Sequence, residues 1–352
     1  MKRKGPETVL VYCPNWVGDV VMATPVLECL RANYPGASLV GVIREYAAGV
    51  LADGPWFDEL ISCREKDFSG FRRLVQRIRA LKPDLSLVLP NSFRSALILA
   101  LAGAGRRIGY RGNGRSLLLH GGPRPLGRTP VPMQDAYFEL CRWLELELPD
   151  SKRPSLYFSE ELTAEADAVL RAHQVTGNEL LIGLNPGAKF GSSKCWPPEY
   201  FAELAERFTA ALDCRILLFT GPGETAIAHA IHRQCTVPLI DLGPDRVDLA
   251  LLKPLIQRCG LLVSNDTGPR HYAVALGVPV VVLMGPTDPV YTQGCLEKSL
   301  VLRRSELDCV PCHQKQCPLS HHACMRGITP VEAFQAGKAM LEAQDGFLCT
   351  QV

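Results

Sequence analysis

Short apolar runs, each ended by a Gly, Pro or Asn/Asp turn and followed by a stretch with helical spacing, recur along the whole sequence. This alternation constrains the fold most, because strand, turn and helix in that order build parallel sheets with crossover helices. In the first half the predicted strands are Thr8–Tyr12, Ser38–Ile43, Glu59–Ser62 and Leu85–Leu89. In the second half they are Leu180–Leu184, Arg215–Phe219, Leu261–Ser264 and Val278–Leu283.

The pattern restarts after a polar stretch, Glu147–Pro154, and 352 residues are too many for one ordinary core. We therefore predict an α/β fold of two Rossmann-like domains, residues 1–160 and 161–330, whose parallel sheets face each other across a cleft. The predicted helices are Val20–Asn33, Phe68–Leu81, Ala164–His173, Glu199–Phe208 and Pro269–Leu276.

Charge and hydropathy exclude two classes of protein. Lysine and arginine number 38, aspartate and glutamate 36, so the net charge of +2 does not indicate a nucleic-acid partner. The basic start, Met1–Lys4, resembles the beginning of a signal peptide, but the apolar run after it is short. The apolar stretch Ala96–Ala104 is far below the roughly 18 to 20 residues that span a bilayer. We expect a cytoplasmic protein that at most lies against a membrane surface.

Ligands of open α/β sheets bind at the carboxyl ends of the strands, where four loops of the second half carry suitable residues. Glycines let backbone amides approach an anion, and helix N-termini add further donors. Each loop alone is an ordinary turn, but the four together predict a phosphate and ribose site. The loops are Asn185–Ala188, Thr220–Glu224, Asn265–Pro269 and Gly285–Asp288.

Two charged residues in this half have alternative interpretations. A diphosphate would repel Asp266, so this carboxylate either receives sugar hydroxyls or caps the helix that Pro269 opens. Lys194 comes shortly before Trp196-Pro197-Pro198, which should begin a helix. A cation there opposes the helix dipole unless an anion lies between them. The alternative is a solvated loop lysine.

In the first half, Asp19 follows the first strand in Asn15-Trp16-Val17-Gly18-Asp19. A sugar transfer needs a base that takes the proton of the acceptor hydroxyl, and Asp19 is the best-placed candidate. It could instead only stabilise a helix N-terminus. Arginine, whose planar fork suits carboxylates and phosphates, is frequent farther on and suggests an acidic acceptor, a solvated loop or contact with anionic lipid. These arginines are Arg94, Arg106, Arg107, Arg111, Arg115, Arg124 and Arg128.

Four of the 14 cysteines form the pattern C-x2-C-x4-C-x6-C at Cys309, Cys312, Cys317 and Cys324. Four thiolates could hold a structural zinc, but the spacing is irregular beside the paired motifs of zinc ribbons. Zinc is therefore not the favoured interpretation. A reduced, tightly turned segment or a disulfide is the alternative.

The motifs in their order resemble the lipopolysaccharide heptosyltransferases, glycosyltransferase family 9, from about residue 8 to residue 290. This resemblance implies a GT-B fold with an acceptor-binding N-terminal domain and an ADP-sugar-binding C-terminal domain. It implies a helix at about 330–352 that packs back on the first domain. The matching motifs are Asn15–Asp19, Asn91–Leu97, Asn185–Ala188 with Lys194–Pro197, and Asn265–Gly268 through His271 to Gly285–Thr287.

The resemblance also implies an inverting transfer, without metal or cofactor, of L-glycero-D-manno-heptose from ADP-heptose to an inner-core heptose of lipopolysaccharide. Asp19 would be the general base, Lys194 would steady the diphosphate and His271 would support the donor loop. The expected donor-binding residues are Gly187, Lys194, Asp266, Thr267, Gly268, His271, Pro286 and Thr287. The expected acceptor-binding residues are Gly18, Arg94, Arg107 and Arg111. We expect a monomer, in peripheral contact with the cytoplasmic face of the inner membrane.

Three other functions compete with this hypothesis. A dehydrogenase would need a G-x-G-x-x-G turn, whereas the first strand ends in Pro14-Asn15-Trp16-Val17-Gly18-Asp19. A nucleotide-sugar epimerase of the same fold would turn over the donor without an acceptor. A binding module without transfer would bind the donor and never turn it over. The same donor could also serve another acceptor, either that of a different core heptosyltransferase or a protein hydroxyl.

Overall fold

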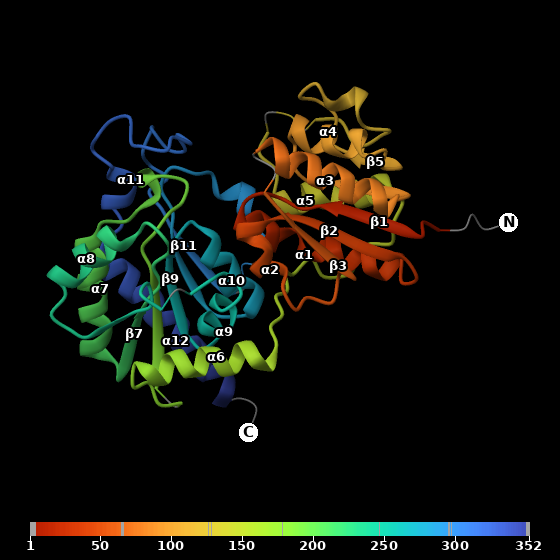
Figure 1. Ribbon diagram of the computed structural model, residues 1–352. Coiled ribbons are helices and arrows are strands. Elements are labelled where there is room, and N and C mark those ends of the chain that lie inside the picture. Colours follow the sequence, from red (N-terminus) through yellow and green to blue (C-terminus); the bar gives the residue numbers. More distant parts are fainter. Residues whose placement is uncertain are drawn as a thin grey trace. The chain divides into compact units, whose positions relative to one another are not determined.

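The computed structural model describes residues 5–64, 67–125, 127, 129–177, 179–245, 247–294, 296 and 298–349, with the side chains of the last helix described up to residue 343. Met1–Lys4 and Arg128, which the sequence analysis named, lie outside these residues. The chain divides into two units, each built on a parallel sheet (Figure 1). The first comprises Met1–Tyr157 with Val290–Gly294, and the second Phe158–Pro289 with Cys295–Val352.

The first unit contains a five-stranded parallel sheet of order β3-β2-β1-β4-β5. The order reverses between β1 and β4, which makes this the topological switch point. The strands are β1 (Thr8–Tyr12), β2 (Ser38–Arg44), β3 (Glu59–Cys63), β4 (Leu85–Val88) and β5 (Arg106–Gly109). The helices are α1 (Val17–Asn33), η1 (Glu45–Ala47), α2 (Ala48–Leu51), α3 (Phe68–Leu81), α4 (Phe93–Leu101), η2 (Arg115–Leu117) and α5 (Met133–Trp143).

The second unit contains a six-stranded parallel sheet of order β11-β10-β9-β6-β7-β8, with its switch point between β6 and β9. The strands are β6 (Leu180–Asn185), β7 (Cys214–Leu218), β8 (Leu239–Asp241), β9 (Leu261–Asn265), β10 (Val280–Leu283) and β11 (Ser299–Leu302). The helices are α6 (Glu160–Ala172), η3 (Ser192–Lys194), α7 (Pro198–Ala211), α8 (Thr225–Gln234), α9 (Leu252–Gln257), α10 (Gly268–Leu276), α11 (Ala323–Arg326) and α12 (Pro330–Cys349), and η4 (Pro289–Thr292) spans the division between the units.

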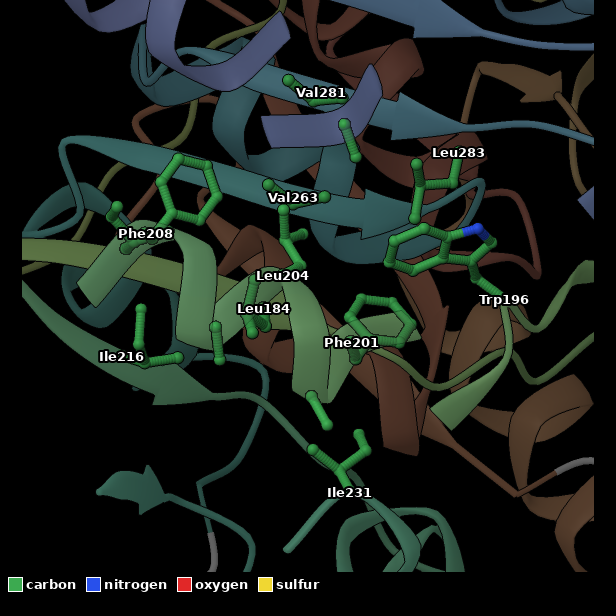
Figure 2. Close-up of a cluster of buried hydrophobic side chains, with 14 of the residues drawn as sticks. Leu184, Trp196, Phe201, Leu204, Phe208, Ile216, Ile231, Val263, Val281 and Leu283 are labelled. Carbon is green, nitrogen blue, oxygen red and sulfur yellow. The ribbon is translucent and has the colours of Figure 1, made fainter. Parts of the chain in front are cut away.

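Strands β4, β9 and β10 are buried along their whole length, as expected when helices cover both faces of a parallel sheet. In the second unit α7 turns Phe201, Leu204 and Phe208 toward the sheet, where they pack with apolar strand residues (Figure 2). Each such side chain contributes about 1.5 to 3 kcal/mol when it leaves water completely. This core fixes β6, β9 and β10 beside one another, so their carboxyl ends meet at one edge.

The predicted strands are all present and parallel, and the predicted α/β class is confirmed. Three short strands, β5, β8 and β11, were not predicted. Helix α1 begins at Val17, three residues before the predicted start, because Trp16 already has the extended backbone of an N-cap.

The units divide at Tyr157, near the predicted boundary of 160, and the binding roles of the two domains stay predictions. The most extensive contacts of α12 are with α7, β9 and β10 of the second unit. The expected packing of this helix on the first domain stays a prediction. Among the described residues, no helix combines the length and the apolar character needed to cross a bilayer.

Candidate functional site

Two buried asparagines join the loops at the switch point of the second sheet. Asn185 ends β6, and its Nδ2 donates to Ser264 Oγ and Thr267 Oγ1, both at 3.0 Å. Asn265 ends β9 and donates from Nδ2 to the carbonyl of Pro186 at 2.7 Å. Its Oδ1 accepts from the amide of Trp196 at 3.1 Å. The loops at 185–188, 194–196 and 265–267 therefore form one connected structure, which includes two of the four loops predicted to converge.

Asp266 is the centre of this structure and is only 6% exposed. Lys194 donates from Nζ to Asp266 Oδ2 at 2.6 Å and to the Asp266 carbonyl at 2.9 Å. Thr287 donates from Oγ1 to the same Oδ2 at 2.7 Å. Arg270 Nε lies 2.9 Å from Oδ1, at ion-pair distance. Three residues, two from loops and one from α10, thus meet at a single carboxylate.

The helix-cap interpretation of Asp266 is wrong. Thr267 is the N-cap of α10, and its side chain makes no capping hydrogen bond. The carboxylate instead accepts from Lys194 and Thr287. The anion expected near Lys194 is therefore already present in part as Asp266, and the uncapped amides at the start of α10 face no side-chain acceptor among the described residues.

The charge state of this network follows from burial and from its neighbours. Burial alone would raise the pKa of Asp266, but Arg270 and then Lys194, with hydrogen bonds from Lys194 and Thr287, lower it below the usual range. Burial, followed by the charges of Arg270 and Lys194, lowers the pKa of His271, although Asp266 opposes the shift. His271 is 9% exposed and neutral at physiological pH. It can support the loop as an uncharged group but not as a cation.

Arg270 is the residue of this site that the sequence analysis missed. Its side chain is 2% exposed, and its Nε and Nη2 make no hydrogen bond among the described residues, although Nε lies near Asp266. Burial lowers the pKa of Arg270, and Asp266 raises it. The sequence signal was the i, i+4 spacing of Asp266 and Arg270 across the helix start, which places an acid and a base on one face.

The remaining predicted donor residues lie at the same edge. Gly187 follows β6, and a Cβ atom there would lie 2.0 Å from a carboxylate oxygen of Glu224, so a larger residue would have to displace the end of that side chain. The carboxylate of Glu224 also accepts from the amide of Gly221 at 2.7 Å. Gly268 begins α10, and Pro286 stands between β10 and Thr287. All eight predicted donor-binding residues therefore belong to loops at the carboxyl ends of β6, β9 and β10 or to the first turn of α10.

In the first unit, Gly18 and Asp19 lie in the first turn of α1, directly after β1. Trp16, the N-cap, makes no side-chain cap and is 54% exposed. Asp19 is half-buried, and its charge contributes, after burial itself, to raising the pKa of Tyr137 on α5. Asp19 therefore stands at the switch point of the first sheet, as expected of a ligand-contacting residue.

The arginines of the first unit differ in their exposure and in the groups that they contact. Arg94 and Arg111 are exposed, and Arg94 lies over the ring of Phe71 at 5.0 Å. Arg107 donates to the carbonyls of Leu118 and Ala104, and burial lowers its pKa. Arg107 therefore holds neighbouring backbone in this structure. Its acceptor-binding role, like those of Gly18, Arg94 and Arg111, stays a prediction.

Arg115 is 1% exposed, and sequence reasoning did not separate it from the other arginines. It donates to the carbonyl of Pro90 at 2.5 Å and to Asn91 Oδ1 at 2.7 Å. Burial lowers its pKa to about 10, so it remains charged at neutral pH. Arg115 thus fixes the loop after β4, the second strand of the switch point, where the predicted acceptor motif begins.

Cys309, Cys312, Cys317 and Cys324 line one small cavity together with His321, His322, Ser193 and Pro286. All four are free thiols, which agrees with the reduced segment rather than the disulfide. Burial first, and then the other three thiols, raise the pKa of Cys324 to about 11. In the described part of the chain, no group of three or more His, Cys, Asp or Glu side chains has an arrangement that could hold a metal ion. Structural zinc stays the possible but not favoured interpretation that it was from the sequence.

A second cavity lies at the opposite, amino end of β6 and is lined by Asp167, Arg171, Glu179 and Arg258 among others. Arg258 already pairs with Asp167 at 2.9 Å. Because open α/β sheets bind their ligands at the carboxyl ends, we assign the functional site to the Asp266 network instead.

Comparison with known proteins agrees with this geometry. Residues 71–323, more than half of the chain, match the family model of glycosyltransferase family 9 (heptosyltransferase). The lipopolysaccharide heptosyltransferase 2 of Escherichia coli K12 is 30% identical over 308 residues, which are 84% of this chain and 87% of the relative. The lipooligosaccharide heptosyltransferase 2 of Campylobacter jejuni is 27% identical over 95% of this chain and 98% of its own length.

Solved structures show the same relationship. The E. coli ADP-heptose lps heptosyltransferase II superimposes with a TM-score of 0.81 at 28% identity and covers 96% of this chain and 99% of its own. A family 9 glycosyl transferase from Veillonella parvula superimposes with a TM-score of 0.84 at 25% identity over 96% and 97% of the two chains. With the Asp266 network at one switch point and the family model across most of the sequence, this chain belongs to glycosyltransferase family 9 and is a glycosyltransferase of the GT-B fold class.

Proposed function

We propose that this chain transfers L-glycero-D-manno-heptose from ADP-heptose to the inner-core heptose of lipopolysaccharide, with inversion at the anomeric carbon. The relatives that match over most of the chain are named lipopolysaccharide or lipooligosaccharide heptosyltransferase 2. The observation that carries the proposal is the buried Lys194–Asp266 pair beside the uncapped start of α10. Cationic and amide donors at one strand edge suit a diphosphate.

The roles proposed for residues that bind ADP-heptose follow from the N–H groups that are not used within the Asp266 network. Lysine has three N–H donors, and the described contacts of Lys194 use two of them, both on Asp266. The third can reach a diphosphate oxygen, and the amides of Thr267 and Gly268 can bind others. Asp266 acts mainly by orienting Lys194, and its Oδ1 can accept a sugar hydroxyl. These groups stabilise the negative charge that develops on ADP as it leaves.

The acceptor hydroxyl attacks the anomeric carbon while the bond from that carbon to the ADP oxygen breaks and ADP keeps the electron pair. Asp19 accepts the hydroxyl proton as the general base. Its position in the first turn of α1 stabilises its ionised form and weakens it as a base. Proton transfer to Asp19 therefore occurs late, after attack has made the hydroxyl acidic. No metal or cofactor takes part in this scheme.

Mass spectrometry of the product tests the proposal. The full chain is incubated with ADP-heptose and a panel of truncated core oligosaccharides that end before, at and after the first inner-core heptose. We expect a mass gain of one heptose only when the first heptose is present and unsubstituted. Transfer to a core that lacks it, or to a protein hydroxyl instead, would contradict the proposed acceptor while leaving the donor intact.

The alternative activities give different results in the same assay. An epimerase of this fold would convert the donor without any acceptor, and a binding module would bind the donor without turnover. ADP release measured with and without the oligosaccharide identifies the transferase, because only the transferase depends on both substrates. Analysis of the donor after incubation without the oligosaccharide then separates an epimerase, which changes the sugar, from a binding module, which leaves the donor unchanged.

A further inference from the structure

The four-cysteine segment, defined here as Leu307–Met325, is fastened to the loop that carries Lys194. Ser193, which is 2% exposed, makes three hydrogen bonds to this segment. Its amide donates to the Lys315 carbonyl at 3.1 Å, and its Oγ donates to the Gln314 carbonyl at 2.5 Å. Its carbonyl accepts from His322 Nε2 at 2.9 Å, so that nitrogen must carry the hydrogen. The amide, the hydroxyl and the carbonyl of Ser193, the residue before Lys194, are therefore all hydrogen-bonded to the four-cysteine segment.

The backbones of the two segments also touch. Gly191 has a φ of 154°, and a Cβ atom there would lie 2.2 Å from the Lys315 carbonyl oxygen. A backbone atom cannot move aside as a flexible side chain can. This close approach requires glycine and adds to the attachment of the Lys194 loop.

The same segment holds the loop that carries Thr287. The amide of His313 donates to the Pro286 carbonyl at 2.9 Å. A Cβ atom at Gly285 would lie 2.6 Å from the sulfur of Met325 and 2.9 Å from that of Cys324, so the segment packs directly on the end of β10. Thr287 and Lys194 are the two residues that donate hydrogen bonds to the Asp266 carboxylate. Both follow directly after residues that the four-cysteine segment holds.

The segment itself is anchored in the core. Cys324 and Met325 belong to the buried cluster beneath α7, and Leu307 and Val310 pack against it. From these contacts we propose that the four-cysteine segment sets the position of Lys194 and Thr287 at Asp266, with His322 and Ser193 as positioning residues. This inference rests on the proposed function only in that Lys194 binds a diphosphate.

The test compares three single variants of the full chain. His322→Phe removes the donor to the Ser193 carbonyl, and His322→Gln keeps an amide donor near the position of Nε2. His321→Phe is the matched control, because His321 accepts from the Ala323 amide at 2.9 Å and makes no described contact with the Lys194 loop. Melting temperatures of all three show which variants fold.

The first readout needs no ligand. Amine labelling with acetic anhydride, followed by mass spectrometry, measures the reactivity of Lys194 against Lys189, an exposed lysine on the same loop. We expect labelling of Lys194 relative to Lys189 to rise several-fold in His322→Phe, because the amine leaves Asp266. The ratio should stay near the wild-type value in His322→Gln and in His321→Phe.

The second readout is the dissociation constant of ADP by titration calorimetry. We expect roughly a ten-fold weakening in His322→Phe, because the displaced amine of Lys194 makes a poorer charge-assisted hydrogen bond to the diphosphate. Glutamine should restore binding to within about three-fold. In a Lys194→Met background, His322→Phe should change the ADP dissociation constant by less than about two-fold, because the two residues act through one contact.

An unchanged labelling ratio in His322→Phe overturns the inference. The inference is also overturned if His322→Phe weakens ADP binding equally in the wild-type and Lys194→Met backgrounds. It is likewise overturned if His321→Phe weakens ADP binding as much as His322→Phe does. Either result means that the segment acts on the fold as a whole. Failure of the wild-type chain to bind ADP would instead count against the proposed function. The labelling comparison would still decide the inference in that case.

Discussion

The two sheets have the same strand order at their switch points. Their carboxyl edges differ in how deeply the charged side chains are buried. At the second sheet, Asp266 and Arg270 are almost completely buried, and Lys194, whose side chain is 12% exposed, completes the network. At the first sheet, Asp19 is half-buried, and Arg94 and Arg111 are exposed. Among the described arginines of the first unit, only Arg115 is buried, and its described bonds go to the loop after β4.

This difference indicates different degrees of preorganisation. A buried charge network cannot rearrange cheaply, because each ion needs its partners. Such an edge suits one invariant group, such as a diphosphate. Exposed arginines can adopt many rotamers and suit a larger acceptor. Substitutions at the second edge should therefore affect stability and donor binding together, whereas substitutions at the first edge should affect turnover or acceptor binding alone.

The largest effect is expected at the first edge, from Asp19→Asn. Loss of a general base should lower kcat by about 100-fold to 10,000-fold, because proton transfer belongs to the transition state. The donor dissociation constant should stay within about two-fold, and the melting temperature should fall only slightly, because a carboxylate at the start of α1 stabilises that helix by about 0.3 to 1 kcal/mol. Steady-state kinetics and calorimetry measure both. If the variant keeps most of its turnover, Asp19 is not the general base and only stabilises the start of α1.

Arg270→Met should destabilise the second unit by about 3 to 5 kcal/mol, because it leaves the Asp266 carboxylate buried without its nearest guanidinium. Urea denaturation measures the loss. Arg258→Met is the matched control, since Arg258 pairs with Asp167 where both side chains are partly exposed, and it should cost no more than about 1 kcal/mol. Equal losses in the two variants would mean that the network is not preorganised by charge.

The stability of the second unit should also depend on pH through Asp266. Its pKa is lower in the folded than in the unfolded chain, so the stabilisation is complete above about pH 4, the unfolded value, and is lost as the pH falls toward the folded pKa. A shift of this kind contributes on the order of 2 kcal/mol. Urea denaturation between pH 7 and pH 3 should show a steeper loss for the wild type than for Asp266→Asn. Parallel curves would contradict the assignment.

The smallest effect is expected from Arg94→Ala and Arg111→Ala at the first edge. Exposed charges contribute about 0 to 1 kcal/mol, so the KM for the oligosaccharide should rise by no more than about five-fold. The increase should shrink at high salt, because exposed charges are screened. Donor affinity and melting temperature should not change. A stability loss in either variant would show that these arginines, like Arg107, hold backbone.

The sequence predicted the parts of the fold that repeat a clear pattern. Strands such as Leu261–Ser264 are continuous apolar runs followed by turn residues, and each was found in place. Strand β5 was not predicted because it begins with two arginines and so lacks an apolar run, and β8 was not predicted because it has only three residues. Such strands form because a neighbouring strand offers hydrogen bonds, which local sequence does not record.

The candidate site was predicted by residue type but not by contact. Lys194 and Asp266 were both named, yet 72 residues separate them, and only folding places them 2.6 Å apart. Arg270 and Arg115 were not recognised because a buried arginine and a solvated arginine look alike in a sequence. For the four-cysteine segment, the sequence left a reduced turn, a disulfide or a zinc site that was not favoured, and it did not indicate the hydrogen bonds that join this segment to the two donor loops.

By itself, the sequence determined the succession of strands and helices and the chemical character of each strand-end loop, because both depend on neighbours a few residues apart. Only the tertiary structure decided which charges are buried and which side chain faces which. Burial and pairing depend on segments far apart in the chain, and they set the pKa of Asp266 and the orientation of Lys194. The local sequence thus determines which residue types are available for chemistry, whereas tertiary packing determines their charge states and positions.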